Sequence, residues 1–230
     1  MNTATMTASA AKPEGNWLYR VGGIASLAIG VAYIVIIVLY VSVGAPPVGG
    51  EAWLNYLVGK TTIWWAIVGI SVLTNFLFVP VSLSLYFALS NDNRIAMLMG
   101  VAFVGLFVTL ELAVNWASYA SLIMLSRDYA AATNDSQRAI FVAAASYPSA
   151  VIASPLALVY AIGTLSFGFL VIGFVMLKGV FSKLTAYIGI VTGVLGIAAV
   201  AGASMAVILN AVFATIWLFF VGCRLYRLAQ

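Results

Sequence analysis

Six stretches of the chain are long and apolar enough to cross a lipid bilayer as helices. A hydrocarbon core about 30 Å thick requires about 20 apolar residues in a helix. The stretches cover residues 19–43, 61–89, 95–125, 153–177, 184–203 and 206–225. Only 7% of the residues are charged, against about 25% in soluble domains, so the apolar excess must face lipid. The sequence predicts an all-α polytopic membrane protein, a bundle of six transmembrane helices.

The basic residues are unevenly distributed between the two sides that six crossings would create. One side carries Lys12, Arg20, Arg94, Lys178, Lys183, Arg224 and Arg227. The other side carries Lys60, Arg127 and Arg138. Lys and Arg are enriched in cytoplasmic loops, so seven cations against three predict that both termini are cytoplasmic.

The chain is expected to consist of an N-terminal tail and one transmembrane domain. Residues 1–18 are small and polar and lack the pattern of a signal peptide, so we expect a disordered cytoplasmic tail there. Residues 19–230 are then a single transmembrane domain.

Two segments on the outer side are expected to form short interfacial helices. Residues 51–58 place apolar side chains on one side, and residues 137–147 follow a run of polar residues suited to capping a helix. Pro148 is expected to separate the second segment from the following span, whose first turn would hold Pro155. A single long bent helix over residues 137–177 is the alternative.

Several kinds of chemistry are excluded by the residue types that are absent. The chain has no histidine and a single cysteine, Cys223. It therefore lacks the residues for an internal disulfide, for histidine-ligated haem and for most zinc or iron catalytic sites. We expect no metal site, no cofactor and no nucleic-acid partner, and a non-enzymatic role is favoured over an enzymatic one.

Glu111 is the only ionisable acid or base well inside any apolar stretch. A charge at mid-membrane costs at least about 2.5–3.5 kcal/mol, so this carboxyl must stay neutral, face water or meet a polar partner. Asn115 lies one helical turn further on, and Asn75 is expected at the same depth in the preceding span. The other polar candidates in this half of the bundle are Ser118, Tyr119, Tyr160 and Asn210.

These residues predict a polar cavity in the outer half of the bundle, centred on Glu111. It would bind a proton, a cation or the polar head of a ligand. The alternative is a structural hydrogen-bond cluster with a permanently protonated Glu111.

Small residues at four-residue spacing mark two helix faces suited to close packing. They are Gly22, Ser26 and Gly30 in the first span and Gly189 and Gly193 in the fifth. We expect internal packing seams, with self-association as the alternative. At the C-terminal end, Arg224 and Arg227 are expected to anchor at the head groups of anionic membrane lipids.

Several segments resemble a family of bacterial six-span membrane proteins described only as a domain of unknown function. The resemblance rests on residues 19–23 (YRVGG), 78–81 (FVPV) with 85–86 (LY), 178–184 (KGVFSKL) and the Arg224–Arg227 ending. It implies six spans and a bacterial inner membrane. It implies no catalytic residue.

Three functional hypotheses follow. The leading one is a protein that binds or transports an ion, a proton or a small amphiphile in the cavity around Glu111. The second is an accessory or structural subunit of a larger membrane complex. The third is an intramembrane enzyme that uses Glu111 as general acid or base.

Overall fold

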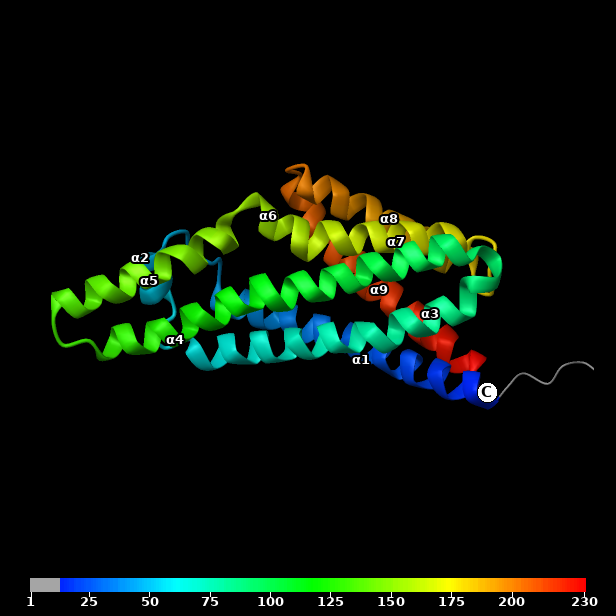
Figure 1. The fold of residues 1–230 in the computed structure, drawn as a ribbon, viewed down its shortest axis with the longest axis horizontal. Coiled ribbons are helices and arrows are strands. Elements are labelled where there is room, and N and C mark those ends of the chain that lie inside the picture. The colour runs from blue at the N-terminus through cyan, green and yellow to red at the C-terminus, as the bar shows by residue number, and fades with distance from the viewer. Residues whose placement is uncertain (1–12) are drawn as a thin grey trace, which may run out of the picture.

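All the regular structure in the part of the chain described by the computed structural model, residues 13–230, is helical (Figure 1). The α-helices are α1 (Pro13–Val43), α2 (Gly50–Tyr56), α3 (Thr61–Leu110), α4 (Ala117–Ala131), α5 (Asp135–Ala153), α6 (Pro155–Leu158), α7 (Thr164–Met176), α8 (Lys183–Val200) and α9 (Ser204–Leu228). Two π-helical segments, η1 (Glu111–Trp116) and η2 (Val159–Gly163), continue α3 into α4 and α6 into α7. The all-α class is confirmed.

Five helical segments in the described residues are long and apolar enough to cross a membrane. They are Asn16–Val43, Thr61–Ala131, Pro155–Met176, Lys183–Val200 and Ser204–Leu228. This composition is that of a multi-pass membrane protein.

The longest of these segments, Thr61–Ala131 with 71 residues, is not straight. At Asn93 the backbone leaves the helical region, with φ −160° and ψ 92°. The Asn93 side chain accepts a hydrogen bond from the backbone N–H of Ala96 at 3.0 Å, as a helix N-cap does. The chain reverses direction there (Figure 1). The rings of Phe78 and Phe107, one from each arm of α3, pack edge to face with centroids 5.5 Å apart.

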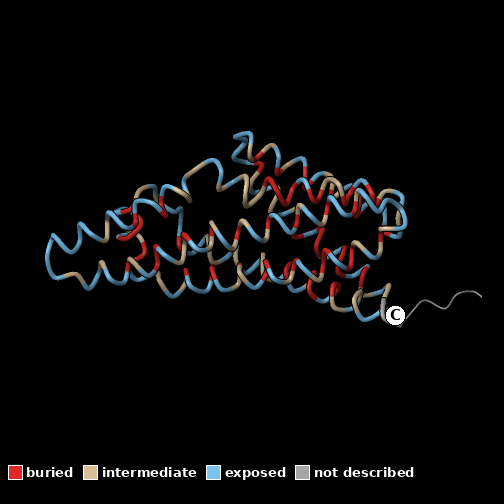
Figure 2. Tube along the Cα trace, viewed as in Figure 1, coloured by how far each residue is buried: buried red, intermediate tan, exposed pale blue. Residues whose placement is uncertain are grey.

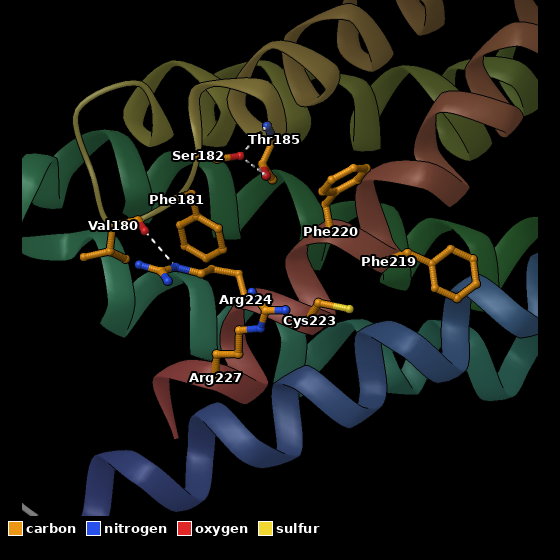
Figure 3. Close-up of a pocket in the computed structure, with 9 residues that line it drawn as sticks. All are labelled: Val180, Phe181, Ser182, Thr185, Phe219, Phe220, Cys223, Arg224 and Arg227. Carbon is orange, nitrogen blue, oxygen red and sulfur yellow. Dashed lines mark hydrogen bonds between the residues drawn. The ribbon is translucent and has the colours of Figure 1, made fainter. Parts of the chain in front are cut away.

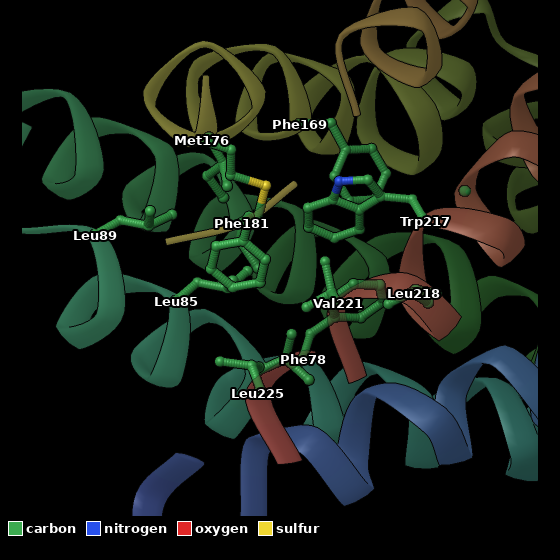
Figure 4. Close-up of a cluster of buried hydrophobic side chains, with 14 of the residues drawn as sticks. Phe78, Leu85, Leu89, Phe169, Met176, Phe181, Trp217, Leu218, Val221 and Leu225 are labelled. Atoms are coloured by element: carbon green, nitrogen blue, oxygen red, sulfur yellow. The ribbon is translucent and has the colours of Figure 1, made fainter. Parts of the chain in front are cut away.

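The arms of α3 and the other long helices form a bundle around an apolar core. The helices that pack against each other are α1 with α3 and α9, α3 with α7, and α8 with α7 and α9. Figure 4 shows the centre of the core, where the ring of Phe169 lies 4.7 Å from that of Trp217. Figure 2 shows the buried residues gathered between the helices, while the outer faces are exposed.

The predicted small-residue faces are internal packing seams. Ser26 is fully buried and donates to the Leu218 carbonyl at 2.7 Å. A Cβ added at Gly30 would meet the Phe219 ring at 3.0 Å, and one added at Gly193 would lie 2.7 Å from the Ser166 carbonyl oxygen. These faces are therefore filled by helices of the same chain.

The outer segments agree with the prediction in part. The first short helix is present as α2, with Trp53 and Leu54 at most 1% exposed on its inner face and Glu51, Ala52 and Asn55 exposed on the other, so α2 is a helix at the protein surface. The second, α5, continues through Pro148. The break comes at Ser154, whose ψ is 148°, because a residue that precedes a proline disfavours the helical conformation. Neither the separation at Pro148 nor the single helix over residues 137–177 is correct.

The N-terminal boundary also shifts. Helix α1 begins at Pro13, so residues 13–18 of the predicted tail are helical, and residues 1–12 lie outside the described part. The start of α1 and the end of α9 lie at the same end of the bundle (Figure 1).

The hairpin of α4 and α5 extends beyond the other helices at the opposite end (Figure 1). The helical run over residues 94–131 is about 55 Å long at 1.5 Å per residue, which exceeds the hydrocarbon core of about 30 Å. A large part of this hairpin therefore stands outside a bilayer that contains the rest of the bundle.

Candidate functional site

Four of the predicted site residues line one cavity. They are Asn75, Glu111, Asn115 and Tyr119. The cavity has a volume of about 280 Å³. Its other lining residues are Tyr33, Ile36, Ile37, Tyr40, Ser71, Thr74, Phe107, Trp116, Ala161 and Ala211. The expectation that Asn75 and Glu111 lie at the same depth agrees with this geometry.

The carboxyl of Glu111 is positioned by a local change of helix type. Glu111 begins η1, and Asn115 lies one π-helical turn away; both side chains are 5% exposed. The Asn115 Nδ2 group donates to Glu111 Oε1 and also to the Ala157 carbonyl at 3.2 Å. Asn115 therefore joins the carboxyl to α6. Short π-helical segments inside α-helices are frequent at functional sites.

The neighbouring chain segment has a second π-helical turn at the same depth. The segments η1 and η2 are in contact, and Ala161 of η2 contributes to the cavity wall. The cavity wall is therefore formed in part where these two π-helical turns meet.

Two polar side-chain atoms in the cavity wall have no hydrogen-bond partner in the described chain. They are Asn75 Nδ2 and Asn115 Oδ1, and both are buried, whereas the Trp116 indole N–H faces the Glu111 carboxyl. Leaving a buried polar group unpaired costs about 1–3 kcal/mol. Both residues line the cavity, so these atoms are available to a polar group inside it.

The cavity reaches the outer surface of the bundle along α1. Tyr33, Ile36, Ile37 and Tyr40 follow the spacing of one helix face and line the cavity. Ile37 is 41% exposed, and its neighbour Val38 is 62% exposed. Ala211 of α9 lines the cavity as well, so α1 and α9 both contribute to its wall, and Ile37 is the lining residue of α1 that reaches the exposed apolar surface.

A cluster of aromatic residues adjoins the cavity on the side of α2. Trp64 is fully buried; it stacks on Tyr119 with centroids 5.3 Å apart and meets Tyr40 edge to face at 5.5 Å. Trp53 of α2 packs on Trp64 at 5.3 Å. These rings separate the cavity from α2 and the outer end of the molecule.

The other predicted site residues lie elsewhere. Ser118 donates to the Val114 carbonyl at 2.7 Å and lines a separate cleft between α4 and α5. Asn210 joins α9 to α8 by donating to the Thr192 carbonyl at 2.7 Å. Tyr160 lies in η2, half-buried and outside the cavity wall. Arg224 and Arg227 lie at the end of α9 and line a different cleft.

Tyr33, Tyr40 and Trp116 are cavity residues that the sequence did not single out as a group. Tyr33 and Tyr40 could have been predicted as a pair, because they are seven residues apart and therefore lie on one face of an apolar helix. Trp116 follows Asn115 directly and would point elsewhere in a regular α-helix, so its place in the wall depends on η1.

The charge of the cavity wall is set by Glu111 alone. No Lys or Arg is found among the lining residues. In the described residues there is no group of three or more His, Cys, Asp or Glu side chains that could hold a metal ion.

A comparison of the chain with protein-family models, with curated proteins and with solved structures finds no match. The site is therefore interpreted from its own geometry.

Proposed function

We propose that the chain crosses a bacterial inner membrane six times with both termini in the cytoplasm. The reversal at Asn93 supports this count, because it divides the 71-residue helical segment into two antiparallel arms. The excess of basic residues at the end that carries the chain termini supports the orientation. The resemblance to a bacterial six-span family supports the membrane.

Within this topology, we propose that the protein binds the polar head of a small amphiphile in the cavity around Glu111. The observation that carries this proposal is the buried, unpaired Asn75 Nδ2 in the cavity wall. It is a hydrogen-bond donor, so the head group must offer an acceptor, such as a carbonyl, ether or hydroxyl oxygen.

The lining of the cavity restricts the charge of the ligand's head group. No basic residue in the wall would compensate the charge of a bound anion, and burying an uncompensated charge is costly. The ligand head is therefore uncharged, or cationic with Glu111 ionised.

The dimensions and the opening favour an amphiphile over a water-soluble ligand. The volume of about 280 Å³ lies near the lower limit of ligand sites, about 300–1,000 Å³, so it holds a head group and not a long chain. The exposed apolar side chain of Ile37 at the opening provides a surface along which a hydrocarbon tail lies while it remains in the lipid.

The accessory-subunit hypothesis stays a second candidate because of the hairpin of α4 and α5. Ile140 is 65% exposed and Tyr147 is 77% exposed, and such apolar side chains favour contact with another protein. The enzymatic hypothesis has less support, since the side chain bonded to Glu111 is the amide of Asn115, which does not exchange a proton near neutral pH.

The test is a binding titration of the protein in lipid nanodiscs with three amphiphiles that share one alkyl tail. Their heads are a methyl ketone, a trimethylammonium group and a sulfate, and quenching of tryptophan fluorescence reports binding. The ketone and the ammonium compound are expected to bind and the sulfate is not. Asn75→Ala should weaken binding of the ketone about fivefold, the equivalent of one hydrogen bond of about 1 kcal/mol.

Ser118→Ala is the matched control, because Ser118 is buried in the same region but does not line the cavity. It should bind all three compounds as the wild type does. Equal affinity of the wild type for all three heads, unchanged in Asn75→Ala and Glu111→Gln, would show that the cavity is not a binding site.

A further inference from the structure

A second cleft lies at the opposite end of the bundle, beside the end of α9. It has a volume of about 740 Å³ and is lined by Val180, Phe181, Ser182, Thr185, Phe219, Phe220, Cys223, Arg224 and Arg227 (Figure 3). It shares no lining residue with the cavity around Glu111. This cleft is therefore a separate feature, independent of the function proposed above.

The lining of the cleft changes from cationic to apolar along α9. Arg227 and Arg224 lie at the end of the helix, and Phe220 and Phe219 lie about 10 Å further along it, at 1.5 Å per residue. The Arg end is at the chain terminus, where the bundle leaves the bilayer, and the Phe end points toward the hydrocarbon. A phospholipid has the same order of parts, with a charged head outside and acyl chains inside.

The cationic end has no acidic residue in its wall. Asp92, an acid on the neighbouring turn, lies against Gly179 and does not line the cleft. Arg224 Nε donates to the Val180 carbonyl at 2.9 Å, which orients the guanidinium across the cleft mouth and leaves its terminal N–H groups for another acceptor. Two guanidinium groups in one cleft without a carboxylate attract an anion.

The start of α8 adds polar groups to the same end. Ser182 caps the helix by accepting from the backbone N–H of Thr185 at 3.1 Å, and the hydroxyls of these residues lie 2.9 Å apart. Both face the cleft (Figure 3). Hydroxyl groups and guanidinium groups together are suited to a phosphate that carries a polar alcohol.

We infer that this cleft is a specific site for one anionic phospholipid. Its phosphate lies between Arg224 and Arg227, and an acyl chain lies along Phe219 and Phe220. In the orientation proposed above, the lipid belongs to the cytoplasmic leaflet.

The first test is native mass spectrometry of the purified protein with equal amounts of phosphatidylglycerol and phosphatidylcholine of identical chains. The wild type should retain phosphatidylglycerol at least fivefold in preference. Arg227→Ala and the double variant R224A/R227A should lose that preference. Arg227→Ala is tested alone as well, because the double variant also removes the hydrogen bond from Arg224 to the Val180 carbonyl.

The matched control is K178A/K183A, which removes two positive charges from the same end of the molecule without changing a lining residue. It should keep the preference for phosphatidylglycerol. If the control loses the preference as completely as R224A/R227A, or if the wild type shows none, the inference is wrong and only a diffuse surface attraction exists.

Cys223 provides a second readout, because it is the only cysteine of the chain, is exposed and lines the cleft. Its reaction with a maleimide should be at least threefold slower in micelles with phosphatidylglycerol than in micelles with phosphatidylcholine, and R227A should remove most of this difference. Equal protection by millimolar glycerol phosphate without lipid would show a site for a soluble anion and would overturn the assignment to a phospholipid.

Discussion

Gly23 illustrates how single residues set the helix spacing in this bundle. A Cβ at Gly23 would lie 2.8 Å from the backbone nitrogen of Tyr226 and 3.0 Å from the Gly222 carbonyl oxygen. Both neighbours are backbone atoms of α9, so α1 and α9 could accommodate a methyl group only by moving apart.

The expected result for Gly23→Ala is a loss of about 1–3 kcal/mol in the free energy of unfolding, the usual cost of overpacking. Unfolding of the detergent-solubilised protein by increasing fractions of dodecyl sulfate, followed by circular dichroism, measures it. Gly69→Ala is the control, since no atom lies within 4 Å of a Cβ at Gly69. A destabilisation of the control as large as that of Gly23→Ala would contradict the explanation.

At this scale the sequence predicted the centre of the site but not its whole wall. Glu111, Asn75, Asn115 and Tyr119 could be predicted because polar groups in apolar helices are costly and must meet. Ser118 was assigned to the same stripe because its spacing assumes a regular α-helix. The π-helical turn at η1 changes the spacing, and Ser118 bonds to its own helix.

Helix α2 shows how a short surface helix is fixed to the bundle by one apolar face. Trp53 is 1% exposed and meets the rings of Trp64 and Tyr119 at 5.3 and 5.8 Å. The Tyr56 hydroxyl donates to the Val43 carbonyl at 3.0 Å and fixes α2 to the end of α1. The sequence predicted this amphipathic helix, but its pattern does not reveal that its apolar face covers the aromatic cluster around Trp64.

Trp53→Ala should lower the free energy of unfolding by about 3–5 kcal/mol, as for other buried aromatic residues. It should also expose the segment around Gly44–Gly49 to limited proteolysis, because α2 loses its main contact. Trp65→Ala is the control. Trp65 is 46% exposed, so its replacement should lower the free energy of unfolding much less. Equal proteolysis of the two variants would mean that the aromatic cluster does not hold α2.

The whole molecule combines a short end, where both chain termini lie, with a long end formed by α4 and α5 (Figure 1). The spans predicted over residues 61–89 and 95–125 already place a reversal in the polar segment between them, since Ser, Asn and Asp favour turns. The length of the outer hairpin was not predicted, because it depends on how far α4 and α5 continue past the apolar stretches.

A topology experiment tests the proposed six crossings. In a Cys223→Ser background, cysteines are introduced one at a time as Asn91→Cys and Ala132→Cys, and intact cells are treated with a membrane-impermeant maleimide. Ala132→Cys should react and Asn91→Cys should react only after the membrane is opened. If both cysteines are labelled from outside, the arm that joins them does not cross the membrane and the proposed count is wrong; if only Asn91→Cys is labelled, the count holds and the proposed orientation is wrong.

The π-helical turn at Glu111 has a mechanical consequence for the outer hairpin. A π-helical turn holds about one residue more than an α-helical turn, which corresponds to a rotation of about 100° around the helix axis. The helix continues from η1 into α4 without interruption. A return of η1 to α-helical winding would therefore turn α4 about its axis, so the helix type next to the carboxyl sets which face of the hairpin is presented outside the membrane.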